Sequence, residues 1–292
     1  MTNAAITSIG AGHPDEPIVR LRRPGRWVAA AVLAVLAAMC VHFVATSPKL
    51  RLDLVAGYLF ERSILRGLLS TLELTVAAML VGLVLGTAIA IMRLSQNPLL
   101  RAVGSGYVWL FRGTPILVQL LFWFFLGTIL PQISVGIPFG PAFASVPTNT
   151  LITQFTAAIL GLGLNEAAYM AEIVRAGIGS VDRGQTEAAH ALGMSPWVTY
   201  RRVVLPQAAR LIVPPTANET ISMLKMTSLV LVIGLPELMT TAQLIYGRNF
   251  QQIPLLIVAS IWYLVLTTVL TIIQNRLERR MSRGIRLSIG GH

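Results

Sequence analysis

The sequence predicts an all-α integral membrane protein with six transmembrane helices. Hydrophobic residues make up 54% of the 292 residues and charged residues only 12%, whereas a soluble domain carries about 25% charged residues. The mean hydropathy of +0.70 also indicates burial in lipid. The apolar residues gather into six runs of about 20 residues, the length that an α-helix needs to cross the hydrocarbon layer.

The six runs follow one another with polar or basic segments between them. The predicted spans are residues 27–45, 68–92, 107–130, 151–173, 211–235 and 254–273. The fifth is the weakest, because Pro214 and Pro215 lack a backbone N–H and should rule out a regular helix at that point. No segment carries a strong strand signal. We expect the uncharged residues 131–150 to form an ordered external loop.

A cleaved secretory signal peptide is the alternative interpretation of the first run. Its apolar stretch is longer than the roughly 7–15 residues of a signal sequence, and a long basic segment precedes it. We therefore expect a retained helix. The first residues, 1–18, are polar and contain Gly and Pro, which is typical of a disordered tail.

The basic residues distinguish the two sides of the membrane. Most of the 23 Lys and Arg residues flank the runs on the side that holds both termini and the segment between the fourth and fifth runs. Because cytoplasmic flanks collect Lys and Arg, we place this side in the cytoplasm. The predicted organisation is a cytoplasmic tail (1–26), an extra helix (27–45), a transmembrane domain (63–281) and a second cytoplasmic tail (282–292).

Several kinds of chemistry lack the residues they need. The two lysines, Lys49 and Lys225, do not follow a phosphate-binding glycine loop, so we predict no ATPase site in this chain. The four histidines are scattered and the single Cys40 has no partner for a disulfide, so no metal site and no catalytic residue are expected. The net charge of +11 does not indicate nucleic-acid binding, because the basic residues flank apolar runs. Any work on a solute must therefore draw on an ion gradient or on a partner.

Polar residues inside the fourth and fifth runs are candidates for a solute pathway. A charge at the centre of a membrane costs roughly 2.5–3.5 kcal/mol on insertion scales, so it usually has a function. The candidates are Asn165, Glu166, Tyr169, Asn218, Glu219 and Lys225. The alternative is that these groups pair with one another and hold the helices together. Glu172 shares a helical face with Asn165 and is expected to neutralise Arg175 three residues on, in a structural or gating role.

The stretch EAAHALGMSPWVTYRRVVLP (residues 187–206) predicts two short helices with a break between them. Asp182 can cap the first helix, and Gly193 can end it, because glycine tolerates the left-handed conformation. Ser195 and Pro196 are typical of the start of a second helix, which Pro206 should stop.

The first of these helices offers a surface for docking. Ala188 and Ala189 are small and should leave it shallow, with Glu187 exposed. A second protein is one interpretation of what covers it, and a simple connecting loop is the other. His190 has no second ligand or base at helical spacing, so we assign it no chemistry.

Together with Gly193 and the Leu-Pro pair at residues 205–206, the EAA letters resemble the coupling motif of bacterial ABC importer permeases. The stretches FRGTPILVQL, AEIVRAGI and LKMTSL are similar to those of the polar amino acid uptake subfamily. The resemblance covers about residues 63–281. It implies a five-helix core, formed here by the second to sixth spans, with the first span as an addition.

The resemblance also implies partners. A cytoplasmic ATPase homodimer would hold ATP and Mg²⁺, no cofactor would bind this chain, and the loop residues Glu187, Ala188, Ala189 and Gly193 would form the coupling helix. A second permease copy, identical or not, would complete the pathway, and an external binding protein would deliver the solute. ATP would close the ATPase pair and turn the pathway outward, and hydrolysis would reset it.

The solute implied is a polar amino acid, with an opine or another amino acid derivative as the alternative. The six pathway candidates map onto the spans that line the family's pathway, and Arg112, Gly113 and Thr114 of the RGTP motif map near its cytoplasmic mouth in a structural or gating role. A secondary transporter that works without an ATPase is the competing hypothesis from another class.

Overall fold

A computed structural model describes residues 24–137 and 142–281. The tails predicted for residues 1–23 and 282–292 lie outside the described residues. Residues up to Leu50 and residues from Arg51 onward form two separate units. In the first unit, α1 (Pro24–Thr46) is a continuous helix whose described side chains are exposed, and η1 (Pro48–Leu50) follows it.

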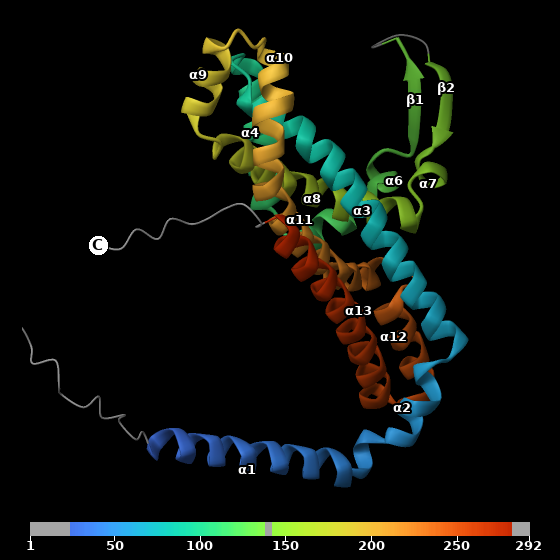
Figure 1. The fold of residues 1–292 in the computed structure, drawn as a ribbon. Helices are drawn as coiled ribbons and strands as arrows, with labels where there is room; N and C mark the ends of the chain where they lie inside the picture. The colour runs from blue at the N-terminus through green and yellow to red at the C-terminus, as the bar shows by residue number, and fades with distance from the viewer. Residues whose placement is uncertain (1–23, 138–141, 282–292) are drawn as a thin grey trace, which may run out of the picture. The chain divides into compact units, whose positions relative to one another are not determined.

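The second unit is mainly helical (Figure 1). Its first half holds α2 (Leu52–Leu59), α3 (Arg62–Leu94), α4 (Pro98–Gly113), α5 (Ile116–Phe124), α6 (Leu126–Ile129), β1 (Gln132–Gly136), β2 (Ala142–Pro147) and α7 (Thr148–Leu151). Its second half holds α8 (Gln154–Gly179), α9 (Arg183–Ala191), α10 (Pro196–Thr199), η2 (Tyr200–Val204), α11 (Leu205–Met226), η3 (Thr227–Ile233), α12 (Leu238–Asn249) and α13 (Gln252–Met281).

Four helices of the described chain are long and apolar enough to cross a membrane, and the number is six if each of two bent pairs is one span. The four are Trp27–Thr46, Arg62–Leu94, Gln154–Gly179 and Gln252–Met281. The predicted third span is not one straight helix, because α4 and α5 meet at 100°. Pro115 causes this break, since it holds an extended conformation at the N-cap of α5.

Helix α8 is the centre of the packed unit. It packs against α3, α4, α5 and α11. Of its most apolar 18-residue stretch, 67% is buried, whereas the share in α13 is 11%. The contact with α3 is the closest, and α3 presents small residues every four positions there: Ala78, Gly82, Gly86 and Ala90. A Cβ added at Gly86 would lie 2.7 Å from the Ala167 carbonyl oxygen, so the two backbones touch in the way that small residues permit in membranes.

Two expectations about proline are wrong. Helix α11 runs through Pro214 and Pro215 without a break, because the fixed φ of proline is compatible with a helix even though each proline lacks the N–H for an intrahelical bond. Nor does Pro206 stop a helix: the five-residue π-turn η2 leads directly into α11, with Pro206 in its first turn. The chain changes direction after η3, where Gly234 has a φ of 71°. The helical segment that ends at Ile233 and helix α12 meet there at a bend of 45°.

The expectation of a chain without strands is also wrong. Strands β1 and β2 form an antiparallel hairpin in which Gln132 pairs with Pro147 and Gly136 with Ala142. Its exposed β-branched and aromatic residues, such as Val135 and Phe143, favour strands. The hairpin projects away from the helices (Figure 1). The prediction of a mostly helical protein is therefore confirmed, and the prediction of an entirely helical one is wrong.

Candidate functional site

The loop between α8 and α11 folds as two short helices with a break between them. Asp182 caps α9, where its Oδ1 accepts a hydrogen bond from the Gly184 N–H at 2.6 Å. Gly193 has a φ of 76° and ends the turn, and Ser195 and Pro196 begin α10. These local predictions are confirmed. Helices α9 and α10 lie together at one end of the second unit, with the α2 region at the other (Figure 1).

The surface of this loop is more apolar than the sequence analysis expected. Glu187 and Ala188 are exposed, while Ala189 is 4% exposed and packs inward. Leu192 is 83% exposed and Trp197 68% exposed. An exposed tryptophan and an exposed leucine on one loop are typical of a contact surface, and only the structure reveals that both side chains are exposed.

Three elements bring candidate pathway residues together. The Arg112 guanidinium at the end of α4 lies over the Tyr169 ring of α8, with Cζ 5.0 Å from the ring centre. Glu219 of α11 lies within electrostatic range of both Arg112 and Glu166 of α8. The structure thus groups two carboxylates, one guanidinium and one aromatic ring.

Glu166 is the most enclosed charged candidate, at 2% exposure. Its Oε1 has no hydrogen-bond partner within the described residues. Gly82 of α3 provides the space for its side chain, because a Cβ at Gly82 would lie 2.5 Å from Glu166 Cγ. A buried carboxylate oxygen without a partner costs free energy, so it is poised to accept a donor.

Asn165 has a different role from a free pathway residue. Its Nδ2 donates to the Phe111 carbonyl oxygen at 2.9 Å and to Gln119 Oε1 at 3.3 Å. Gln119 in turn donates to the Phe111 and Thr114 carbonyl oxygens at 2.9 and 3.1 Å. These carbonyls are freed by the break between α4 and α5. Asn165 and Gln119 therefore hold the RGTP turn, and with it Arg112, in place. Sequence analysis missed Gln119.

Within the described residues, no hydrogen bond or ion pair joins the two remaining candidates to this group. Asn218 is exposed on α11. Lys225 lines a separate cavity of about 380 Å³ with Ser228 and the α13 residues Ser260 and Tyr263. No ion pair or side-chain hydrogen bond in the described part of the chain joins Glu219 to Lys225.

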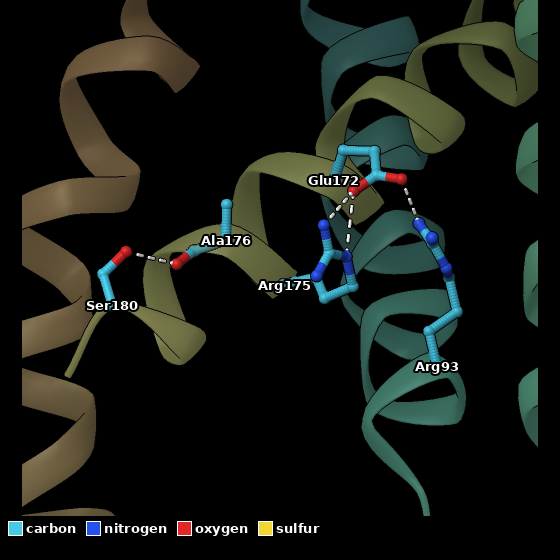
Figure 2. Close-up of polar contacts among 5 residues, drawn as sticks. All are labelled: Arg93, Glu172, Arg175, Ala176 and Ser180. Carbon is cyan, nitrogen blue, oxygen red and sulfur yellow. Dashed lines mark hydrogen bonds and ion pairs between the residues drawn. The ribbon is translucent and has the colours of Figure 1, made fainter. Parts of the chain in front are cut away.

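Glu172 joins two helices through a pair of arginines. Its Oε2 accepts from Arg175 at 2.9 Å, as predicted, and its Oε1 pairs with Arg93 of α3. Figure 2 shows Glu172 between the two guanidinium groups, with the Ser180 hydroxyl bonded to the Ala176 carbonyl one turn further on. The arginine on α3 was not predicted, because only the fold brings it to α8.

Comparison with known proteins gives one consistent family. The model of the family described as "Binding-protein-dependent transport system inner membrane component" matches residues 78–283. An "Arginine transport system permease protein" of Corynebacterium glutamicum is 46% identical over 272 residues, covering 90% of this chain and 82% of that protein. An "L-cystine transport system permease protein" of Bacillus subtilis is 38% identical, covering 74% of this chain and 86% of that protein.

A solved structure agrees with these relatives. The crystal structure of an amino acid ABC transporter with histidines superposes with a TM-score of 0.63 at 37% identity, covering 75% of this chain and 94% of that one. A methionine ABC transporter at 20% identity has a TM-score of 0.60, which shows the shared fold.

Proposed function

This chain belongs to the family of binding-protein-dependent transport system inner membrane components, and we propose that it is the permease subunit of an ATP-driven importer for a polar amino acid. It is a multi-pass protein of the bacterial inner membrane and is not itself an ATPase. The names of two relatives state which amino acid they transport: arginine for one and cystine for the other.

The grouping of Glu166 and Glu219 near Arg112 is the observation that supports an amino acid with a cationic side chain. The two carboxylates can pair with an ammonium or guanidinium group, and Arg112 can pair with the α-carboxylate. A buried Glu166 oxygen without a partner supports the same role. An opine or another amino acid derivative carries the same charged groups and remains the alternative solute.

The exposed face of α9 and α10 supports coupling to an ATPase. This surface includes Glu187, Ala188 and Gly193, which are exposed. Ala189 is buried and packs toward the inside of the loop. We assign the contact to the cytoplasmic ATPase, which would bind ATP and Mg²⁺ while this chain binds no cofactor. A secondary transporter acting alone would leave this apolar surface without a partner.

The assembly we propose has two permease subunits, identical or not, an ATPase homodimer and an external binding protein. Each permease would contribute a five-helix core within residues 63–281, with the bent pairs α4–α5 and α11–α12 each counted as one span. Helix α1 would be an added sixth span, and both termini would lie in the cytoplasm, because the basic residues gather on that side.

Uptake into proteoliposomes tests this function. The permease and its ATPase would be reconstituted into vesicles with ATP inside. The binding protein and radiolabelled amino acids would be added outside. We expect uptake that requires ATP and the ATPase, with a preference for arginine or lysine over leucine. Glu219→Gln should weaken that preference by about tenfold, as loss of one charge pair of about 1.4 kcal/mol would.

Two controls sharpen the result. Glu278→Gln, near the end of α13, removes a carboxylate outside the site and should leave the preference unchanged. ATP-independent uptake driven by an ion gradient would contradict the importer, and an unchanged preference in Glu219→Gln would contradict the pathway assignment alone.

A further inference from the structure

A polar pocket is lined by residues of α2, of the start of α3 and of the end of α12. These elements lie at the end of the second unit opposite α9 (Figure 1). We call this site the α2–α12 pocket. Its polar lining includes Tyr58, Glu61, Ser63, Arg248 and Asn249. Its volume of about 420 Å³ lies within the roughly 300–1,000 Å³ range of small-molecule sites.

The walls of this pocket are fixed to one another. The Asn249 side-chain amide donates to the Tyr58 hydroxyl at 3.1 Å, which ties the end of α12 to α2. The Trp262 indole N–H of α13 donates to the Leu59 carbonyl at 2.8 Å, which holds the other side of α2. The pocket is thus preformed.

Two opposite charges line the pocket without pairing. Glu61 Oε1 accepts a hydrogen bond from Ser63 at 2.9 Å, while Glu61 Oε2 is shielded from solvent and has no partner within the described residues. Arg248 lines the same pocket and is exposed. Neither Arg248 nor Glu61 forms an ion pair in the part of the chain that the structure describes. A carboxylate and a guanidinium left unpaired in one pocket fit a ligand that supplies both complementary charges.

We propose that the α2–α12 pocket binds the ammonium and carboxylate groups of a free amino acid. The ammonium group pairs with Glu61 and the carboxylate with Arg248, in charge-assisted hydrogen bonds. The pocket lies apart from the Glu166–Glu219 group, at the end of the molecule away from the ATPase face, and serves as an entry site for solute released from the binding protein. The choice of an amino acid as ligand rests on the function proposed above.

Equilibrium binding tests the proposal independently of transport. The permease purified with its ATPase would be placed in nanodiscs of phosphatidylglycerol, which offers no zwitterionic headgroup, and titrated with radiolabelled L-arginine without ATP or binding protein. We expect a saturable component that weakens by about tenfold in both Glu61→Gln and Arg248→Gln and persists in Glu219→Gln. Agmatine, which lacks the carboxylate, should bind weakly and show no response to Arg248→Gln.

Asp53→Asn is the matched control. Asp53 lies on α2 at the same end, but its carboxylate already pairs with Arg51 at 3.1 Å, and that hydrogen bond holds the pKa of this carboxyl below its ordinary value. Its loss should not change binding. Arg248 is exposed, so Arg248→Gln should fold normally even if the Glu61 variant does not.

Three results would overturn the proposal. One is a binding curve that neither Glu61→Gln nor Arg248→Gln alters, and another is the absence of saturable binding of any amino acid while the complete importer still transports. The third is competition by added phosphatidylethanolamine at the affected component, because it would assign the pocket to a lipid headgroup. Failure of uptake by the complete importer would instead contradict the proposed function.

Discussion

Gly82 determines how closely Glu166 approaches helix α3. A Cβ at this position would meet Glu166 Cγ at 2.5 Å and Cβ at 2.9 Å, so the carboxylate has to move. We expect Gly82→Ala to cost about 1–3 kcal/mol of stability, as overpacking does, and to lower uptake by displacing Glu166. The measurements are the thermal midpoint in detergent and the initial rate of amino acid uptake.

Gly106 is the control for this substitution. It lies on α4 with open space around the added methyl group, so Gly106→Ala should be neutral or slightly stabilising. Equal losses in both variants would show that a general helix effect, and not the Glu166 contact, is responsible.

Gln119 is a positioning residue for Arg112. Its amide donates to the Thr114 carbonyl and accepts from Asn165 at the 100° bend, so Gln119→Leu leaves the Thr114 carbonyl and one Asn165 N–H without this partner, while the Phe111 carbonyl keeps its bond from Asn165. Each unpaired buried group costs about 1–3 kcal/mol, and the freed turn should loosen Arg112. We expect a higher KM for uptake with the ATPase still bound, measured by uptake kinetics and co-purification.

Gln119→Glu and Gln243→Leu complete this test. The glutamate removes the donor while it keeps the shape, and its charge faces carbonyl oxygens, so it should be at least as harmful as leucine. Gln243 is exposed on α12 and makes no side-chain hydrogen bond in the described part of the chain, so its variant should behave as wild type. A normal KM in both Gln119 variants would refute the positioning role.

At the scale of helices, the Glu172 cluster joins α3 to α8 at the end that carries α9. Glu172→Gln leaves Arg93 and Arg175 facing each other without the carboxylate between them. Because Arg93 has only 17% of its side chain exposed, we expect a loss of about 1–3 kcal/mol. The double variant Arg93→Gln/Glu172→Gln should recover part of it, since the unpaired buried cation is gone.

Arg175→Gln provides the comparison. Its side chain is 41% exposed, so its pair with Glu172 should contribute less than about 1 kcal/mol. Thermal midpoints of the four proteins measure these differences. If the double variant is less stable than Glu172→Gln, the cluster does not act as a link between the two helices.

The α9–α10 surface gives a second prediction for an element. Trp197→Ala and Glu187→Lys should each weaken co-purification with the ATPase, because an exposed tryptophan at an interface often contributes 2 kcal/mol or more by alanine substitution. Trp109→Ala, on the exposed face of α4, is the matched aromatic control. Full retention of the ATPase by both loop variants would move the contact elsewhere.

Sequence reasoning was most accurate where structure is local. Asp182, Gly193 and the Ser195–Pro196 pair determine their own turns, so the two short helices were predictable. Pro115 breaks the helix locally, but the amides that hold the bend between α4 and α5 come from Gln119 and from Asn165, which is distant in sequence. Arg93 and Gln119 were missed because their partners Glu172 and Asn165 lie far away in sequence.

At the scale of the whole molecule, α1 and η1 belong to a different unit from the helices that follow Arg51. The solved amino acid transporter chain is covered to 94% by only 75% of this chain, so its fold is complete without an added segment of this size. We therefore expect a chain starting at Arg51, with a new initiating methionine, to insert, to retain the ATPase and to keep at least about half of the uptake rate. A loss of this size corresponds to only about 0.4 kcal/mol in the barrier.

The deletion also separates two roles of α1. Its segment Trp27–Thr46 is long and apolar enough to cross a membrane, which suits a lipid-embedded anchor. An anchor predicts lower amounts of protein in the membrane with unchanged KM per molecule. Quantitative immunoblotting beside uptake kinetics measures both, and a changed KM at equal protein amount would show that α1 takes part in the pathway.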